Sequence, residues 1–138
     1  MDIVLTHNPR REDVDDIRRG LVDYNRQFMD IQRTSPLGLF INDPQGKKLA
    51  GLTGSLSGDW LRIEMLWISE ALRGQQVGTR LMQAAEEEAR QHQCRYAQVD
   101  TASFQARPFY EKLGYRVGWV LDNYPHPGAQ RFYLTKHL

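Results

Sequence analysis

The sequence predicts a single α/β (α+β) domain over residues 1–138, built on a mixed, largely antiparallel sheet of seven strands with helices on both faces. Two observations support this fold class. Seven short β-prone runs alternate with three helical patterns in the order β-α-β-β-β-α-β-α-β-β, which is not a regular βαβ repeat. A chain of 138 residues also fits one domain and is too short for two independent cores.

The N-terminal region predicts one strand and one helix. The apolar run at residues 3–5 is β-prone and stops at Pro9, which disfavours continuation of a strand. From Asp13 onward, apolar residues recur at steps of three and four, as expected for one face of a helix that extends to residue 28. The residues on this face are Val14, Ile17, Leu21, Tyr24 and Phe28.

Three strands should follow as an antiparallel group. Residues 37–41 and 48–57 flank the segment 42–46, whose Asp43, Pro44 and Gly46 suit a tight turn. Gly58 and Asp59 then lead into a long strand over residues 60–68.

The C-terminal half predicts two helices and three strands. Helical spacing over residues 77–93 is followed by a strand over 96–101 and a short helix over 107–113 that Gly114 stops. The last strands are residues 116–121 and 130–136, separated by a loop whose prolines prevent regular structure.

Composition excludes several classes of function. The net charge of +1 lacks the basic excess typical of proteins that bind nucleic acid. No stretch approaches the ~20 apolar residues of a membrane span, and the N-terminus has no signal-peptide pattern, so we expect a cytoplasmic protein. Cys94 is the single cysteine, which excludes an internal disulfide, and no ligand set suggests a metal. We expect Cys94 to be a packed apolar side chain.

The segment of residues 66–82 reads as a strand, a turn and the start of a helix in direct succession. A glycine-containing turn at a helix N-terminus exposes unpaired backbone N–H groups, and the helix dipole adds positive potential. Arg73 and Arg80 contribute positive charge. This pattern is typical of a pyrophosphate site.

The chain resembles the acetyltransferase (GNAT) family at two places. Arg73, Gln76 and Gly78 match the Arg/Gln-x-x-Gly-x-Gly/Ala loop of that family, except that Gln76 stands at its middle glycine. Residues 106–115 closely match a second family segment, Ala-x-x-Phe-Tyr-x-Lys-x-Gly-Phe/Tyr. Three residues before this segment, Ser103 stands where the family commonly has asparagine. The resemblance covers essentially the whole chain and implies a sheet whose strands 60–68 and 96–101 splay apart.

The resemblance also implies acetyl-coenzyme A (acetyl-CoA) as the acetyl donor, with no metal. Its pyrophosphate would lie on the turn, and its pantetheine arm between the splayed strands, where strand backbone groups could polarise the thioester carbonyl. The expected acetyl-CoA-binding residues are Leu66, Trp67, Ile68, Arg73, Gly74, Gln75, Gln76, Val77, Gly78, Thr79, Ser103 and Arg107.

Two residues are candidate catalytic groups. An amine acceptor is mostly protonated at neutral pH, and Glu64, which shares strand parity with Leu66 and Ile68, could take its proton directly or through water. Glu64 could equally be a surface carboxylate paired with a cation. The resemblance implies that Tyr110 returns a proton to the leaving thiolate, whereas its alternative is a packed aromatic side chain.

The acceptor is expected to be the primary amine of a small molecule. Asp122 and His126 lie in the loop of residues 122–129, where an acid could hold a cationic amine, although solvated polar residues would look the same. Two alternatives remain open: acetylation of a protein N-terminus or lysine, and a coenzyme A-binding module without catalysis. Homodimers are common in the family, so a homodimer is possible here.

Overall fold

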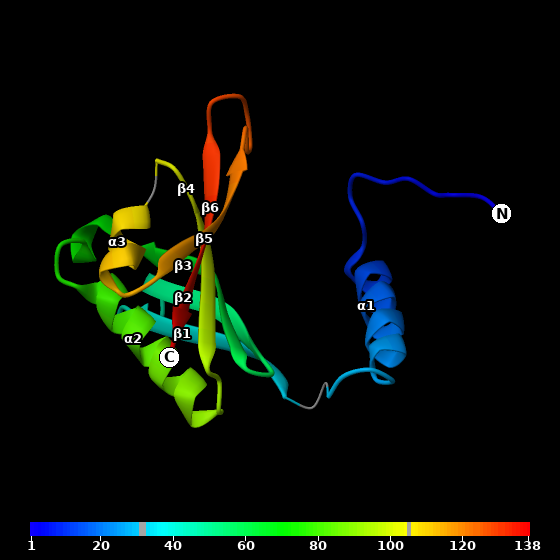
Figure 1. Ribbon diagram of the computed structural model, residues 1–138, viewed down its shortest axis with the longest axis horizontal. Helices are drawn as coiled ribbons and strands as arrows, with labels where there is room; N and C mark the ends of the chain where they lie inside the picture. The colour runs from blue at the N-terminus through cyan, green and yellow to red at the C-terminus, as the bar shows by residue number, and fades with distance from the viewer. Residues whose placement is uncertain (31–32, 105) are drawn as a thin grey trace. The chain divides into compact units, whose positions relative to one another are not determined.

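The computed structural model describes residues 1–30, 33–104 and 106–138. The chain falls into two compact units, unit 1 (Met1–Gln32) and unit 2 (Arg33–Leu138). Unit 2 contains the sheet (Figure 1), and the residues that line the pocket described below also belong to unit 2.

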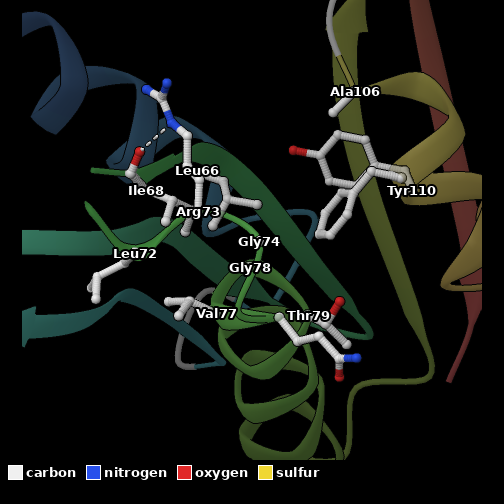
Figure 2. Close-up of a pocket in the computed structure, with 12 residues that line it drawn as sticks. Leu66, Ile68, Leu72, Arg73, Gly74, Val77, Gly78, Thr79, Ala106 and Tyr110 are labelled. Atoms are coloured by element: carbon white, nitrogen blue, oxygen red, sulfur yellow. Dashed lines mark hydrogen bonds between the residues drawn. The ribbon is translucent and has the colours of Figure 1, made fainter. Parts of the chain in front are cut away.

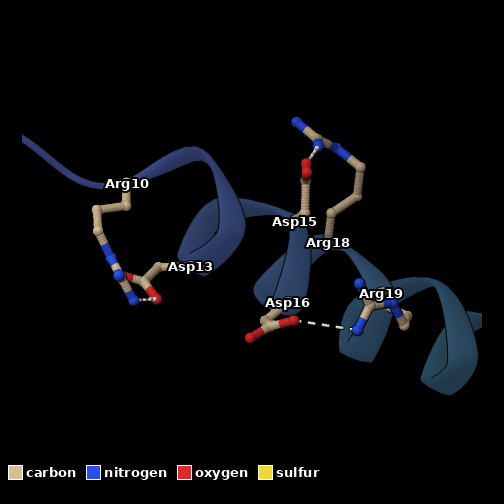
Figure 3. A network of polar contacts seen from close by, with 6 residues as sticks. All are labelled: Arg10, Asp13, Asp15, Asp16, Arg18 and Arg19. Carbon is tan, nitrogen blue, oxygen red and sulfur yellow. Dashed lines mark hydrogen bonds and ion pairs between the residues drawn. The ribbon is translucent and has the colours of Figure 1, made fainter.

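Unit 1 contains helix α1 (Arg11–Asn25), which confirms the helix predicted from apolar spacing. Ion pairs three residues apart reinforce it, and each exposed pair of this kind contributes only about 0.3–0.5 kcal/mol. Figure 3 shows three of them: Arg10 with Asp13 at 3.3 Å, Arg18 with Asp15 at 2.8 Å, and Arg19 with Asp16 at 3.0 Å.

The strand predicted at residues 3–5 is wrong. Ile3, Val4 and Leu5 are exposed and have no regular secondary structure. A strand persists only where a neighbouring strand satisfies its backbone N–H and C=O groups, and no register pairs these three residues within the described part of the chain. The β-propensity of these three residues is therefore not sufficient to make them a strand.

Unit 2 is built on a mixed sheet, which confirms the predicted fold class with six strands in the described residues rather than seven. The strand order is β1-β2-β3-β4-β6-β5, in which β3 and β4 are parallel and the other neighbours antiparallel. The strands are β1 (Thr34–Asn42), β2 (Lys48–Ser57), β3 (Trp60–Ile68), β4 (Tyr96–Ala102), β5 (Arg116–Asp122) and β6 (Gln130–His137).

The β1–β2 hairpin forms at the predicted turn. The Asp43 carboxylate accepts backbone N–H groups from Gln45 and Lys47, each at 2.9 Å, and Gly46 takes a positive φ of 86°. A side-chain acceptor that mimics a backbone turn explains why this sequence reverses the chain here.

Two helices cover one face of the sheet: α2 (Val77–Gln91) and α3 (Arg107–Lys112) lie on the same side in Figure 1. The core lies between these helices and the sheet, and Leu52, Leu61, Ile63, Met82 and Leu134 are almost fully buried in it. Cys94 is buried as well, and burial raises the pKa of its thiol, as expected for a packed side chain. None of the helices in the described residues is long and apolar enough to span a membrane.

A buried carboxylate fixes α2 to the C-terminal strands. Glu86 is only 3% exposed, and it accepts the Tyr115 hydroxyl and the Lys136 ammonium, each at 2.8 Å. Burying a charge is costly unless it is paired and hydrogen-bonded, and here both oxygens are satisfied. Helix α2 is therefore held in a defined position against β6.

The sheet opens between β3 and β4. Their parallel register joins only residues 60–62 of β3 to residues 96–98 of β4, so the strands separate beyond Arg62 and Gln98. A β-bulge next to Gly54 shifts the β2–β3 register, and a Cβ at Gly54 would collide with the carbonyl oxygen of Arg62. Glycine thus allows the close approach that bends β3 away. The predicted splayed pair is formed.

Candidate active site

A mostly apolar pocket of about 370 Å³ opens where β3 and β4 separate. Figure 2 shows side chains from β3, the following turn, α2 and α3 around it. The lining residues are Leu66, Ile68, Leu72, Arg73, Gly74, Gln76, Val77, Gly78, Thr79, Ala106, Phe109 and Tyr110.

The turn of residues 73–79 forms one end of this pocket. It begins after a 3-10 turn (Glu70–Leu72) and bends through positive φ at Gly74 (78°) and Gln76 (60°) before α2 starts at Val77. Unpaired N–H groups in the first turn of a 15-residue helix then face the pocket end. This arrangement suits a phosphate group.

Gln76 adopts the left-handed conformation that a glycine would occupy most easily. Gln76 therefore differs from the family's middle glycine in its side chain but adopts a backbone conformation that suits glycine. Gln76 also lines the pocket, beside the candidate phosphate site.

Gly78 lies where α2 meets α3. A Cβ at this position would come within 3.2 Å of the Phe109 ring, which is tighter than ordinary contact. Glycine therefore allows the start of α2 to lie close to the Phe109 ring of α3.

Arg73 is anchored beside the turn. Its Nε donates a 3.2 Å hydrogen bond to the carbonyl of Ile68, and this bond is drawn in Figure 2. This bond fixes the side chain of Arg73, a cationic residue that lines the pocket.

Tyr110 lies on the opposite wall from β3. Its residue is 7% exposed, and in Figure 2 its hydroxyl points across the opening toward the side of Leu66 and Ile68. Burial, and secondarily the negative charge of Asp100, raise the pKa of the phenol above its usual value. The phenol is therefore held in its protonated form, as a proton donor requires.

Glu64 does not lie where the parity argument placed it. The β2–β3 register pairs Gly54 with Ile63 and Thr53 with Met65, so Glu64 falls in the β-bulge between them. A bulge resets the alternation of a strand, and counting by twos from Glu64 to Leu66 was wrong for that reason. Glu64 is exposed beside the opening and does not line the pocket itself.

Four other predicted acetyl-CoA-binding residues lie outside the pocket lining. Trp67 is exposed, and the Gln75 amide donates to the carbonyl of Ala71. Arg107 pairs with Glu111 at 3.0 Å and stacks over the Phe132 ring at 4.4 Å. The backbone N–H of Ser103 donates to the carbonyl of Gln130.

The predicted acceptor-side residues belong to the β5–β6 connection. Asp122, at the end of β5, accepts a 2.9 Å hydrogen bond from Gln130, and His126 is exposed with its Nδ1 3.2 Å from the carbonyl of Pro127. Two residues that line the pocket, Leu72 and Phe109, were not predicted from the sequence. Phe109 could have been found, because it lies inside the segment that matches the family.

The site therefore combines a turn suited to a phosphate group, a splayed strand pair and a phenol on the opposite wall. The sequence profile described as "Acetyltransferase (GNAT) family" matches residues 7–115. The chain belongs to the acetyltransferase (GNAT) family and is an acetyl-CoA-dependent N-acetyltransferase.

Similar proteins agree with this assignment. The chain is 33% identical over 134 residues to the blasticidin-S acetyltransferase of Streptomyces morookaense, covering 94% of this chain and 97% of that protein. An acetyltransferase from Bacillus cereus has a crystal structure with a TM-score of 0.79 at 28% identity, covering 98% of each chain. An aminoglycoside 6'-N-acetyltransferase crystallised with coenzyme A shares the fold, with a TM-score of 0.65 at 17% identity and coverage of 99% and 97%.

Proposed function

We propose that this enzyme transfers an acetyl group from acetyl-CoA, bound in the pocket at the β3–β4 opening, to the primary amine of a small molecule. The observation that carries the proposal is one continuous pocket with the turn of residues 73–79 at one end and Tyr110 at the other. Its apolar lining between these ends suits a pantetheine arm.

The residues present fit the donor. Gly78 and the positive φ of Gly74 leave backbone N–H groups accessible, and Arg73 adds charge for a pyrophosphate. In the described residues no register joins β3 to β4 beyond Arg62, so the backbone of β3 near Leu66 could hold an amide or a thioester carbonyl, although the Ile68 carbonyl already accepts Arg73 Nε. Acetyl-CoA supplies an activated acetyl group as a thioester, and its sulfur leaves as a thiol.

Two side chains of this protein would act as proton acceptor and proton donor. Glu64, exposed beside the opening, accepts a proton from the incoming ammonium, directly or through water. The Tyr110 hydroxyl holds a proton at the far end of the pocket and gives it to the leaving sulfur.

Support for a small-molecule acceptor comes from the relative that covers nearly the whole chain, whose name states an antibiotic substrate. We infer an amine-bearing antibiotic or a similarly sized amine as the acceptor. Asp122 and His126 would lie near such an acceptor because the β5–β6 connection adjoins the C-terminal end of β4 in the sheet.

The test is release of free coenzyme A thiol with blasticidin S, an aminoglycoside, spermidine, a peptide with a free N-terminus, and buffer alone. We expect thiol release with at least one small amine at several times the buffer rate, together with product that gains one acetyl group by mass spectrometry. Preference for the peptide would favour a protein acceptor. Thiol release equal to buffer for every amine would favour a binding module.

A further inference from the structure

An ion pair on β4 and β6 borders the opening and belongs to none of the roles described above. Asp100 lies beyond Gln98, in the part of β4 that no longer pairs with β3. Ala97, Val99 and Thr101 are buried toward the helices, so the alternation of β4 directs Asp100 to the opposite face of the sheet. Its side chain is 19% exposed.

The partner of Asp100 is Arg131 of β6. Arg131 Nε lies 2.7 Å and its terminal nitrogen 2.6 Å from the same carboxylate oxygen, Oδ2. The charge-assisted hydrogen bond from Nε, reinforced by the close ion-pair contact, holds the carboxylate in one orientation. Since both contacts end on Oδ2, the ion pair does not use Oδ1.

Arg131 also connects this carboxylate to the β5–β6 connection. Its guanidinium lies 5.7 Å from the centroid of the Tyr124 ring, within range of a cation–π interaction. Asp100 is therefore linked through Arg131 to the connection that carries Asp122 and His126.

We propose that Asp100 binds the acceptor amine by accepting one of its N–H groups at Oδ1, and that Arg131 is the positioning residue that aims this oxygen at the opening. This inference rests on the function proposed above and deepens it. Glu64 borders the opening from β3 and Asp100 from β4, so one carboxylate can remove a proton while the other orients the amine.

The pairing with Arg131 has a chemical consequence. A lone carboxylate beside the amine would stabilise its protonated form, which cannot attack a thioester. Arg131 offsets that charge, so Asp100 can orient the amine by a directional hydrogen bond without holding it as ammonium. The site then suits a primary amine that arrives protonated and reacts neutral.

Several charged or titratable groups of the described residues face Asp100 or border the same opening. They are Arg131 and Tyr133 of β6, Tyr110 of α3, Tyr124 of the β5–β6 connection, and Arg62 and Glu64 of β3. Of these, only Arg131 has a side chain in ion-pair contact with Asp100 in the described part of the chain.

The first test is Asp100→Asn, assayed with the panel amine that the wild type acetylates fastest. We expect kcat/KM for the amine to fall about 10- to 100-fold, the value of a hydrogen bond to a charged group, with the KM for acetyl-CoA unchanged. Glu87→Gln is the matched control, because Glu87 also pairs with an arginine, Arg90 at 3.6 Å, but lies on the exposed face of α2. It should behave as wild type.

The second test is Arg131→Gln, which leaves the Asp100 charge uncompensated. The pKa of the bound amine should rise, and the kcat–pH profile should shift to higher pH, a change that a purely structural role would not produce.

The inference is overturned if folded Asp100→Asn has the same kcat/KM for the amine as the wild type. If Asp100→Asn does not fold, an unshifted Arg131→Gln profile overturns it instead. Failure of the wild type to acetylate any panel amine would count against the proposed function itself.

Discussion

The two sides of the β3–β4 opening differ in the groups that form them: backbone groups on one side and side chains on the other. The turn of residues 73–79 is made of backbone, with left-handed residues, a glycine and the N-terminus of α2, all contiguous in the sequence. On the opposite side lies the side chain of Tyr110 from α3, and the proposed amine site adds the side chains of Asp100 from β4 and Arg131 from β6.

This difference predicts two kinds of sensitivity. A site made of backbone N–H groups tolerates changes of side-chain chemistry but not added volume or negative charge. A site made of side-chain hydrogen bonds responds to the removal of one oxygen. Variants on each side should therefore separate acetyl-CoA binding from turnover.

The largest effect is expected for Tyr110→Phe, on the side-chain half. A general acid typically contributes about 10²–10⁴-fold, so kcat should fall within or somewhat below that range, because a thiolate is already a fair leaving group. Acetyl-CoA affinity by calorimetry should be unchanged. Because burial raises the pKa of this phenol above its usual value, the wild-type kcat should show no loss from its ionisation between pH 7 and 9.

Tyr115→Phe is the matched control for Tyr110→Phe. Tyr115 is also a buried tyrosine, but its hydroxyl donates to Glu86 and not to the pocket. Its removal should lower the free energy of unfolding by about 1–3 kcal/mol and leave kcat unaltered. Full activity in folded Tyr110→Phe would show that its phenol is structural.

The next largest effect is expected for Gly78→Asp, on the backbone half. The new side chain would press on Phe109 at 3.2 Å and place negative charge beside the candidate phosphate site, so acetyl-CoA affinity should fall by about 100-fold. Gly78→Ala adds the volume without the charge and should lose much less. Equal affinity of Gly78→Asp and wild type by calorimetry would move the pyrophosphate away from this turn.

Glu64→Gln is expected to have a smaller effect. Glu64 is exposed, and solvent can also take a proton from the amine, so we expect about a 10-fold loss of kcat at neutral pH that shrinks as pH rises toward the pKa of the amine. Acetyl-CoA affinity should not change. A pH–rate profile that overlays the wild type would indicate that the base is another group, such as His126 or a chain of water.

The same contrast explains what could be predicted from the sequence. The bounds of β2 and β3 and the turn at residues 73–79 follow from local patterns, because each depends on residues adjacent in the chain. The bulge that displaced Glu64 depends on how closely Gly54 approaches Arg62 on the neighbouring strand. The Asp100–Arg131 pair joins residues 31 positions apart, which no local pattern could have identified.

The smallest effect is expected for Gln76→Gly, which sharpens the description of the turn as a backbone site. Gln76 holds a φ of 60°, a conformation in which a non-glycine residue is strained by roughly 1 kcal/mol, and it has no side-chain hydrogen bond as the N-cap of α2. Glycine relieves that strain in the folded state but adds freedom to the unfolded chain, so the two terms oppose each other and the melting temperature should change little. Because the donors at this position are backbone N–H groups, acetyl-CoA affinity should stay within about threefold of wild type, an expected change of less than about 0.7 kcal/mol. Calorimetry and thermal unfolding of the variant measure both quantities. A loss of affinity larger than tenfold would mean that the Gln76 side chain itself contacts acetyl-CoA, and the turn would then share the side-chain character of the opposite wall.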